Sequence, residues 1–222
     1  MYHMLLRLPL FQGMSRGDLF RILEQTAFHF HHIEEGETAF HQGERCDRLT
    51  FLMKTTLGAE TQAPRANLSL SEMLDTFMPI EPQSLFGRYP NYKYTYIAQS
   101  EVSLLSISKQ EVYRMVETYE IFRINLLNML SSKVENLHER IWTIAPHDLE
   151  GRMASLIRNL CTTPKGTKML HCKMEDLAAL LDDTRLNVSR ILNKWRQEGL
   201  IEMRRKEFII HDLADLSHKM AP

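Results

Sequence analysis

Side chains that can hydrogen-bond to nucleic acid cluster near residue 190 of the sequence. The candidates are Thr184, Arg185, Leu186, Asn187, Ser189, Arg190, Asn193 and Lys194. Their polar members can donate to base edges and phosphates, and a leucine can touch a thymine methyl group. Three cations follow at Arg204, Arg205 and Lys206. Cations at a hairpin tip would bind the DNA backbone and make the affinity depend on salt.

The apolar spacing predicts that the first cluster lies on a helix. Val188, Ile191, Leu192 and Trp195 recur at i, i+3, i+4 and i+7, which gives one buried stripe. The opposite face carries Leu186, Arg190, Asn193 and Gln197. Asp183 or Thr184 is the expected N-cap, and Gly199 stands where a helix ends with positive φ. We therefore predict a helix-turn-helix, followed by a hairpin at residues 200–210.

Two features of this segment have ordinary explanations as well. The cationic hairpin could be a solvated charged turn. Leu186 faces away from the apolar stripe, so it could contact either a thymine methyl group or the rest of its own domain.

A long helix is predicted upstream, from about Tyr119 to Ile144. Its apolar residues recur at alternating steps of three and four, as in the seam of a coiled coil. They are Leu127, Leu130, Val134, Leu137, Ile141 and Ile144. This seam could bind a second copy of the chain, or it could lie on the core of its own domain. Pro146 ends the helix, which places a hinge at residues 145–148.

The region from about Phe28 to Ile107 is predicted to be rich in β-strands. Short runs such as Thr50–Met53 and Tyr94–Ile97 are apolar or aromatic, and turn residues such as Gly43 separate them. This spacing indicates a sandwich or jelly roll. Short helices are expected at Ser15–Thr26 before it and at Leu149–Cys161 after the long helix. The fold class is α+β.

Composition narrows the class of protein. The chain has 222 residues, a net charge of −1 and three cysteines, so a DNA-binding surface must come from local clustering of cations. The cysteines form no CxxC pair, which argues against a thiolate zinc site or disulfides and favours a cytoplasmic location. No apolar run is long enough for a membrane span. No catalytic motif is present, so we do not expect an enzyme.

Histidines are the remaining chemical candidates. His29 and His31 would share one face of a strand and could bind a metal or contact a haem. Exposed strand histidines are the ordinary explanation, and we predict no metal site.

Three motifs, taken in order, resemble the CRP/FNR family of bacterial transcription regulators. They are His41–Glu44, Asp148–Ala154, and Val188–Leu192 followed by Glu198–Ile201. The resemblance runs nearly end to end. It implies a cyclic-nucleotide-binding-like β-roll (a double-stranded β-helix) at 1–118, a dimerisation helix and hinge at 119–146, and a winged helix-turn-helix at 147–222. It also implies a homodimer in which Arg185 and Arg190 contact DNA.

The sequence departs from that family in its expected effector segment. The family's cAMP receptors use a Gly-Glu pair and an Arg-Ser pair, whereas this chain has Pro82 or Gln83 in place of the glutamate and Tyr92-Lys93 near the second pair. Lysine lacks the fork geometry of arginine, so we argue against cAMP. Three cysteines also cannot supply the four ligands of an iron–sulfur cluster. The effector remains unknown, with Gln83, Ser84, Tyr92 and Lys93 as candidate contacts.

The reading helix departs from the family too. Leu186 replaces a base-reading glutamate of the best-known members, and Asp182 replaces the usual glycine of the turn. We therefore predict a transcription regulator that binds a palindromic operator of its own as a homodimer and works with RNA polymerase. The alternative is an assembly protein that uses the same domains for protein contacts.

Overall fold

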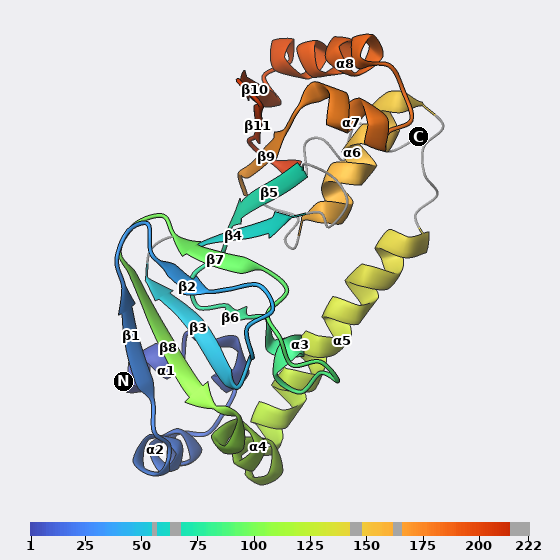
Figure 1. The fold of residues 1–222 in the computed structure, drawn as a ribbon. Helices are drawn as coiled ribbons and strands as arrows, with labels where there is room; N and C mark the ends of the chain where they lie inside the picture. The colour runs from blue at the N-terminus through green and yellow to red at the C-terminus, as the bar shows by residue number, and fades with distance from the viewer. Residues whose placement is uncertain (55–56, 63–67, 143–147, 162–165, 214–222) are drawn as a thin grey trace. The chain divides into compact units, whose positions relative to one another are not determined.

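The computed structural model describes residues 1–54, 57–62, 68–142, 148–161 and 166–213, and its ribbon is drawn in Figure 1. The chain forms two compact units. The first comprises Met1–Leu57 and Leu74–Ile141, and the second comprises Gly58–Met73 and Trp142–Pro222. The mixed content of strands and helices confirms the predicted α+β class.

The first unit contains most of the strands. Its elements are α1 (Tyr2–Leu5), η1 (Pro9–Phe11), α2 (Arg16–Gln25), β1 (His29–Ile33), β2 (Thr38–Phe40), β3 (Arg48–Lys54), β6 (Pro79–Ile80), α3 (Pro82–Leu85), β7 (Thr95–Ala98), β8 (Val102–Ser108), α4 (Lys109–Thr118) and α5 (Glu120–Trp142). One antiparallel sheet has the order β1-β8-β3-β6, and β2 pairs with β7. The sequence-based strands at Thr50–Met53 and Tyr94–Ile97 correspond to β3 and β7.

Helix starts in this unit follow the local sequence. Ser15 is the N-cap of α2 and accepts the N–H of Asp18 at 3.1 Å, as the spacing predicts. Ser108 and Glu111 form a full capping box at the start of α4. Phe122 of α5 then packs edge-on against Phe11, with ring centroids 5.2 Å apart. This contact attaches the first turns of the long helix to the core.

The described residues of the second unit form three helices and five strands. Its elements are β4 (Leu57–Gln62), β5 (Leu68–Met73), α6 (Leu149–Leu160), β9 (Lys168–Cys172), α7 (Met174–Leu180), α8 (Arg185–Gln197), β10 (Ile201–Arg204) and β11 (Glu207–Ile210). The strand order is β10-β11-β9-β5-β4, and neighbouring strands are antiparallel. The predicted C-terminal hairpin thus shares a sheet with β4 and β5, which come from the middle of the predicted β-roll.

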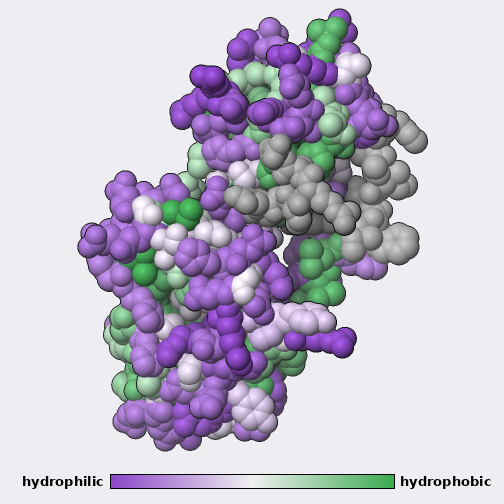
Figure 2. Space-filling view, viewed as in Figure 1, coloured by the Kyte–Doolittle hydropathy of each residue, from purple (hydrophilic) through white to green (hydrophobic). Residues whose placement is uncertain are grey.

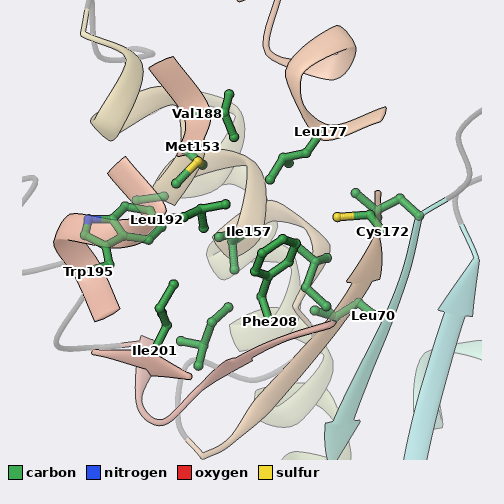
Figure 3. Close-up of a cluster of buried hydrophobic side chains, with 14 of the residues drawn as sticks. Leu70, Met153, Ile157, Cys172, Leu177, Val188, Leu192, Trp195, Ile201 and Phe208 are labelled. Carbon is green, nitrogen blue, oxygen red and sulfur yellow. The ribbon is translucent and has the colours of Figure 1, made fainter. Parts of the chain in front are cut away.

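The placement of β4 and β5 in the second unit differs from the contiguous domain ranges that the sequence suggested. Leu68 and Leu70 of β5 lie in the same core as Ile157, Leu192 and Phe208 (Figure 3). Glu72 of β5 pairs with Lys168 of β9 at 2.8 Å, and both side chains are at most 1% exposed. We propose that the sensor region spans residues 1–118 except for the β4–β5 hairpin, and that residues 119–146 link the two units. The DNA-binding domain then consists of residues 147–222 together with β4 and β5.

Candidate nucleic-acid interface

Helix α8 is held on the second unit by its predicted apolar stripe. Val188, Leu192 and Trp195 are at most 2% exposed, and Ile191 is half-buried. Trp195, which is labelled among the core side chains in Figure 3, also donates its indole N–H to Glu150 of α6 at 2.8 Å. The same Glu150 accepts a hydrogen bond from Lys194 at 2.6 Å. Burial of the stripe fixes which face of α8 points to solvent.

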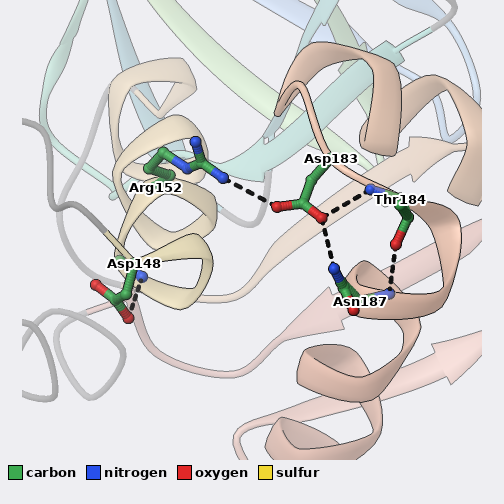
Figure 4. A network of polar contacts seen from close by, with 6 residues as sticks. Asp148, Arg152, Asp183, Thr184 and Asn187 are labelled. Atoms are coloured by element: carbon green, nitrogen blue, oxygen red, sulfur yellow. Dashed lines mark hydrogen bonds and ion pairs between the residues drawn. The ribbon is translucent and has the colours of Figure 1, made fainter.

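The turn before α8 is built by a network of polar side chains (Figure 4). Thr184 is the N-cap and accepts the N–H of Asn187 at 3.2 Å. Asp183 accepts the N–H of Thr184 at 2.7 Å, the amide of Asn187 at 2.8 Å and the guanidinium of Arg152 at 3.0 Å. Asp182, which replaces the usual glycine of the turn, has a φ of 50°, a left-handed conformation that aspartate tolerates. The network ties the start of α8 to α6.

These hydrogen bonds lower the pKa of the Asp183 carboxyl. The largest cause is the amide of Asn187, followed by the N–H of Thr184, and Arg152 adds to both. The carboxylate form therefore stabilises the turn. Sequence reasoning named Asp183 only as a possible cap and missed Arg152 as its partner, because the two residues are 31 positions apart.

Three of the predicted DNA contacts lie on the solvent-facing side of α8, where burial does not restrict their side chains. Arg185, Leu186 and Arg190 are exposed, Leu186 at 61%. Arg185 lies 3.7 Å from Glu175, but both side chains are about 70% exposed, so this ion pair is weak and can be exchanged for a phosphate. No hydrogen bond or ion pair joins Arg190 to other residues in the described ranges. Most of the Leu186 side chain is exposed, which leaves it available to a ligand.

The other predicted contacts of α8 have partners inside the unit. The amide of Asn187 is committed to Asp183, and the amide of Asn193 donates to the carbonyl oxygen of Ser189 at 2.9 Å. Lys194 pairs with Glu150, which raises the pKa of the lysine through their hydrogen bond. The structure thus favours Arg185, Leu186 and Arg190 as the side chains most free to reach DNA.

The cationic hairpin forms as predicted. Strands β10 and β11 pair with Arg204 opposite Glu207, so Arg205 and Lys206 make the turn. Lys206 has a φ of 63°, and its carbonyl oxygen accepts the N–H of Cys172 at 3.1 Å. All three cations are exposed. Arg204 lies 3.7 Å from Glu202, another exposed and weak pair.

A depression between the starts of α7 and α8 and the hairpin joins these two basic elements. Its lining includes Lys173, Arg185, Arg204 and Lys206, together with Glu175. Figure 2 shows that the visible surface over α8 and the hairpin is mostly hydrophilic. Four cations around one shallow depression concentrate positive charge locally on a nearly neutral chain, a charge distribution that suits a phosphate backbone.

The long helix α5 of the first unit has two apolar faces. Phe122 and Leu126 are buried in their own domain, whereas Leu127, Val134 and Leu137 are 56–64% exposed. Figure 2 shows hydrophobic side chains over the middle of α5. Leu130 is half-buried; the side chain of Ile141 and all of Ile144 lie outside the described residues, as does Pro146. The predicted seam at residues 127, 134 and 137 therefore does not lie on its own domain's core.

The predicted effector segment is present as β6, α3 and β7. Gln83 accepts a hydrogen bond from Lys133 of α5 at 3.2 Å, and Ser84 and Tyr92 are buried. The side chain of Lys93 is exposed, but its backbone N–H points inward to Glu81. The sequence-based prediction did not include Glu81, which is adjacent to Pro82 and Gln83 in the predicted effector segment. A glutamate before a proline gave no signal of its buried environment.

Two of the predicted histidines have polar partners on neighbouring strands or loops. His31 hydrogen-bonds to the Ser106 hydroxyl at 2.9 Å and His32 lies 2.8 Å from Glu101. No group of three or more potential ligands that could hold a metal ion occurs within the described ranges. None of the three cysteines forms a disulfide, all three are buried, and burial raises the pKa of the Cys172 thiol to about 12. No described helix is long and apolar enough to cross a membrane.

Fold and surface together define a class of protein: a winged helix-turn-helix DNA-binding protein attached to a β-rich domain and a long helix. Comparisons with known proteins extend this result. Residues 151–219 match the Crp-like helix-turn-helix domain. The global nitrogen regulator of Synechocystis sp. is 24% identical over 200 residues, which cover 84% of this chain and 86% of that protein.

Solved structures with the same fold cover almost the whole chain. The catabolite activator protein of Thermus thermophilus has a TM-score of 0.54 and 17% identity, covering 96% of this chain and 100% of its own. A CRP/FNR-family transcriptional regulator from the same species has a TM-score of 0.50 and 20% identity, covering 86% and 98%. The chain has a Crp-like helix-turn-helix domain and is a DNA-binding transcription regulator similar to those of the CRP/FNR family. The alternative of an assembly protein without DNA binding is not favoured.

Proposed function

We propose that the chain binds DNA as a homodimer, with one α8 helix in the major groove of each half of a two-fold-symmetric site. The observation that carries this proposal is the pair of solvent-facing surfaces: the apolar seam of α5 and the cationic face of α8 with the hairpin. Leu127, Val134 and Leu137 need an apolar partner, and a second copy of the same helix supplies one. A two-fold dimer presents two reading helices, which suit half-sites about one helical turn apart.

The proposed roles of the DNA-facing residues follow from their exposure and from how weakly they are paired within the unit. Arg190, on the exposed middle of α8, is proposed to donate to a base edge, and Leu186 to touch an apolar base group. Arg205 and Lys206 at the hairpin tip are proposed to bind phosphates, with Arg204 beside them. Arg185 exchanges its weak pair with Glu175 for a backbone contact. Thr184, Asn187, Ser189, Asn193 and Lys194 position the helix and contribute backbone contacts at most.

The remaining parts of the proposal concern location and partners. We propose that the protein acts in the cytoplasm and contacts RNA polymerase when bound to its operator. Regulation rather than catalysis is the function, and the β-roll is the domain that would respond to a signal.

Selection of bound duplexes from a random DNA pool tests the proposal. We expect enrichment of a sequence with two inverted half-sites, and binding to it that weakens steeply as salt rises. Enrichment of a single unrepeated half-site would contradict the dimer, and equal affinity for all duplexes would contradict specific reading.

A further inference from the structure

Glu81 places a carboxylate in the interior of the β-roll. The residue follows β6 directly and is only 5% exposed. Its backbone is left-handed, with φ at 40° and ψ at 54°, a conformation that side chains with a Cβ seldom adopt. A buried charge in a disfavoured backbone geometry persists only where its surroundings hold it strongly.

Four donors from two stretches of the chain converge on this carboxylate. The N–H groups of the successive residues Lys93 and Tyr94 donate at 2.8 Å and 3.1 Å, and Lys93 also reaches the second oxygen at 2.9 Å. The hydroxyls of Ser84 and Tyr96 donate at 2.7 Å and 3.0 Å. Successive backbone N–H groups that point at one place form a binding site for an anion.

The surroundings also suit an organic anion. Tyr96 is 3% exposed, and the ring of Tyr92 stacks on Phe40 with centroids 4.5 Å apart. Burial raises the pKa of the Tyr96 phenol, and the charge of Glu81 raises it further, so the hydroxyl stays a donor. The ammonium of Lys133 on α5 adds positive charge near this carboxylate, although burial lowers the pKa of that lysine.

We propose that these donors form an oxyanion-binding site that the chain fills with its own Glu81 carboxylate. Ligands of the matching class are small carboxylates and phosphates, including the phosphate of a nucleotide. They bind only when the Glu81 side chain is removed. The β-roll is therefore held in an anion-occupied form without an external effector at this site. This proposal concerns the first unit alone and stands whether or not the chain binds DNA.

The test uses the full-length protein, the variants Glu81→Gly and Glu81→Gln, and thermal unfolding at constant ionic strength. Glycine removes the carboxylate and suits the left-handed backbone, so the four donors stay in place without an acceptor. Glutamine keeps the size of the side chain but not its charge. The added ligands are sodium formate, sodium acetate, inorganic phosphate and cyclic AMP, each against sodium chloride.

We expect a lower Tm for Glu81→Gly and a saturable rise of that Tm with formate, acetate or phosphate. The natural chain and Glu81→Gln should show no such rise, because a side chain still occupies their site. Rescue by formate and acetate alone would limit the site to carboxylates, and rescue by cyclic AMP would show room for a nucleotide. A folded Glu81→Gly protein that responds to no anion, or a natural chain that responds equally, overturns the proposal.

A second comparison covers the case in which Glu81→Gly does not fold. Tyr96→Phe removes one donor, and it should lower the Tm of the natural chain by more than it lowers the Tm of Glu81→Gln. Equal decreases in Tm in the two backgrounds would mean that the Tyr96 hydroxyl does not stabilise the Glu81 carboxylate, and the proposal would then fail.

Discussion

Replacement of Lys168 by methionine should destabilise the second unit strongly. The ammonium of Lys168 lies 2.8 Å from Glu72, and the two side chains are 0% and 1% exposed. Methionine keeps much of the side-chain volume but leaves the Glu72 carboxylate buried without its cation. Loss of one partner of a buried ion pair costs about 3–5 kcal/mol. In a unit of roughly 100 residues, the lower figure corresponds to a fall in Tm of about 12 °C or more.

The two units need separate readouts for this measurement. Trp195 is 1% exposed in the core of the second unit, so its fluorescence reports the unfolding of that unit. The experiment is therefore done in a Trp142→Phe background, which leaves Trp195 as the sole tryptophan. Thermal and urea unfolding would be followed for Lys168→Met, for Glu72→Leu/Lys168→Met, and for Arg185→Met as an exposed control.

The double variant decides whether the ion pair is the cause. With both charges gone, an apolar pair of similar volume should restore most of the lost stability or exceed it. Arg185→Met breaks an exposed pair and should cost less than about 1 kcal/mol. The reasoning is refuted if Lys168→Met also costs less than about 1 kcal/mol, or if the double variant is no more stable than the single one.

Three further predictions concern DNA, dimerisation and pH. Arg190→Ala should weaken binding to the selected site by about 1–3 kcal/mol and leave nonspecific binding much less affected. Lys206→Ala should weaken binding to both DNAs and reduce the slope of log affinity against log salt concentration by about one in gel-shift titrations. Equal losses on both DNAs for Arg190→Ala would mean that this residue contacts only the DNA backbone. Leu137→Asp should shift the protein from dimer to monomer in sedimentation, while Ser132→Asp on the opposite, exposed face of α5 should not; an unchanged dimer would place the interface elsewhere. Because the pKa of Asp183 is lowered in the folded chain, its stabilising effect should be full above the ordinary aspartate range and vanish as pH falls below it. The Tm difference between the natural chain and Asp183→Ala should therefore shrink from pH 6 to pH 3, and a constant difference would exclude the carboxylate as its source.

Local patterns predicted the reading elements well. The stripe of Val188, Leu192 and Trp195, the cap at Thr184 and the positive φ of Gly199 (72°) depend on residues a few positions apart. Periodicity and capping chemistry act over that range, so a single sequence contains the information. The outward position of Leu186 follows from the same spacing.

Features that depend on distant residues could not be predicted in this way. The pairing of Glu72 with Lys168 joins positions 96 apart, and nothing near either residue indicates a partner. The partners of Glu81 come from residues 84, 93, 94 and 96, and two of the four donors are backbone N–H groups, which carry no side-chain signal. The helical position of Lys194 alone predicts a DNA contact. The fold shows that Lys194 instead donates a hydrogen bond to Glu150.

The β5–β9 pairing also has a consequence for how this protein can be divided or recombined. A fragment that starts at the hinge would contain the whole helix-turn-helix but would present β9 as an open edge and would lack Glu72, the ion-pair partner of Lys168. Such a fragment is expected to aggregate, and a hybrid regulator joined at the hinge would inherit the same defect. During synthesis, residues 68–73 leave the ribosome long before β9 exists, so the reading domain completes its sheet only after a long-range contact forms. The unit that reads DNA is thus encoded in two places, and any transplant has to carry both.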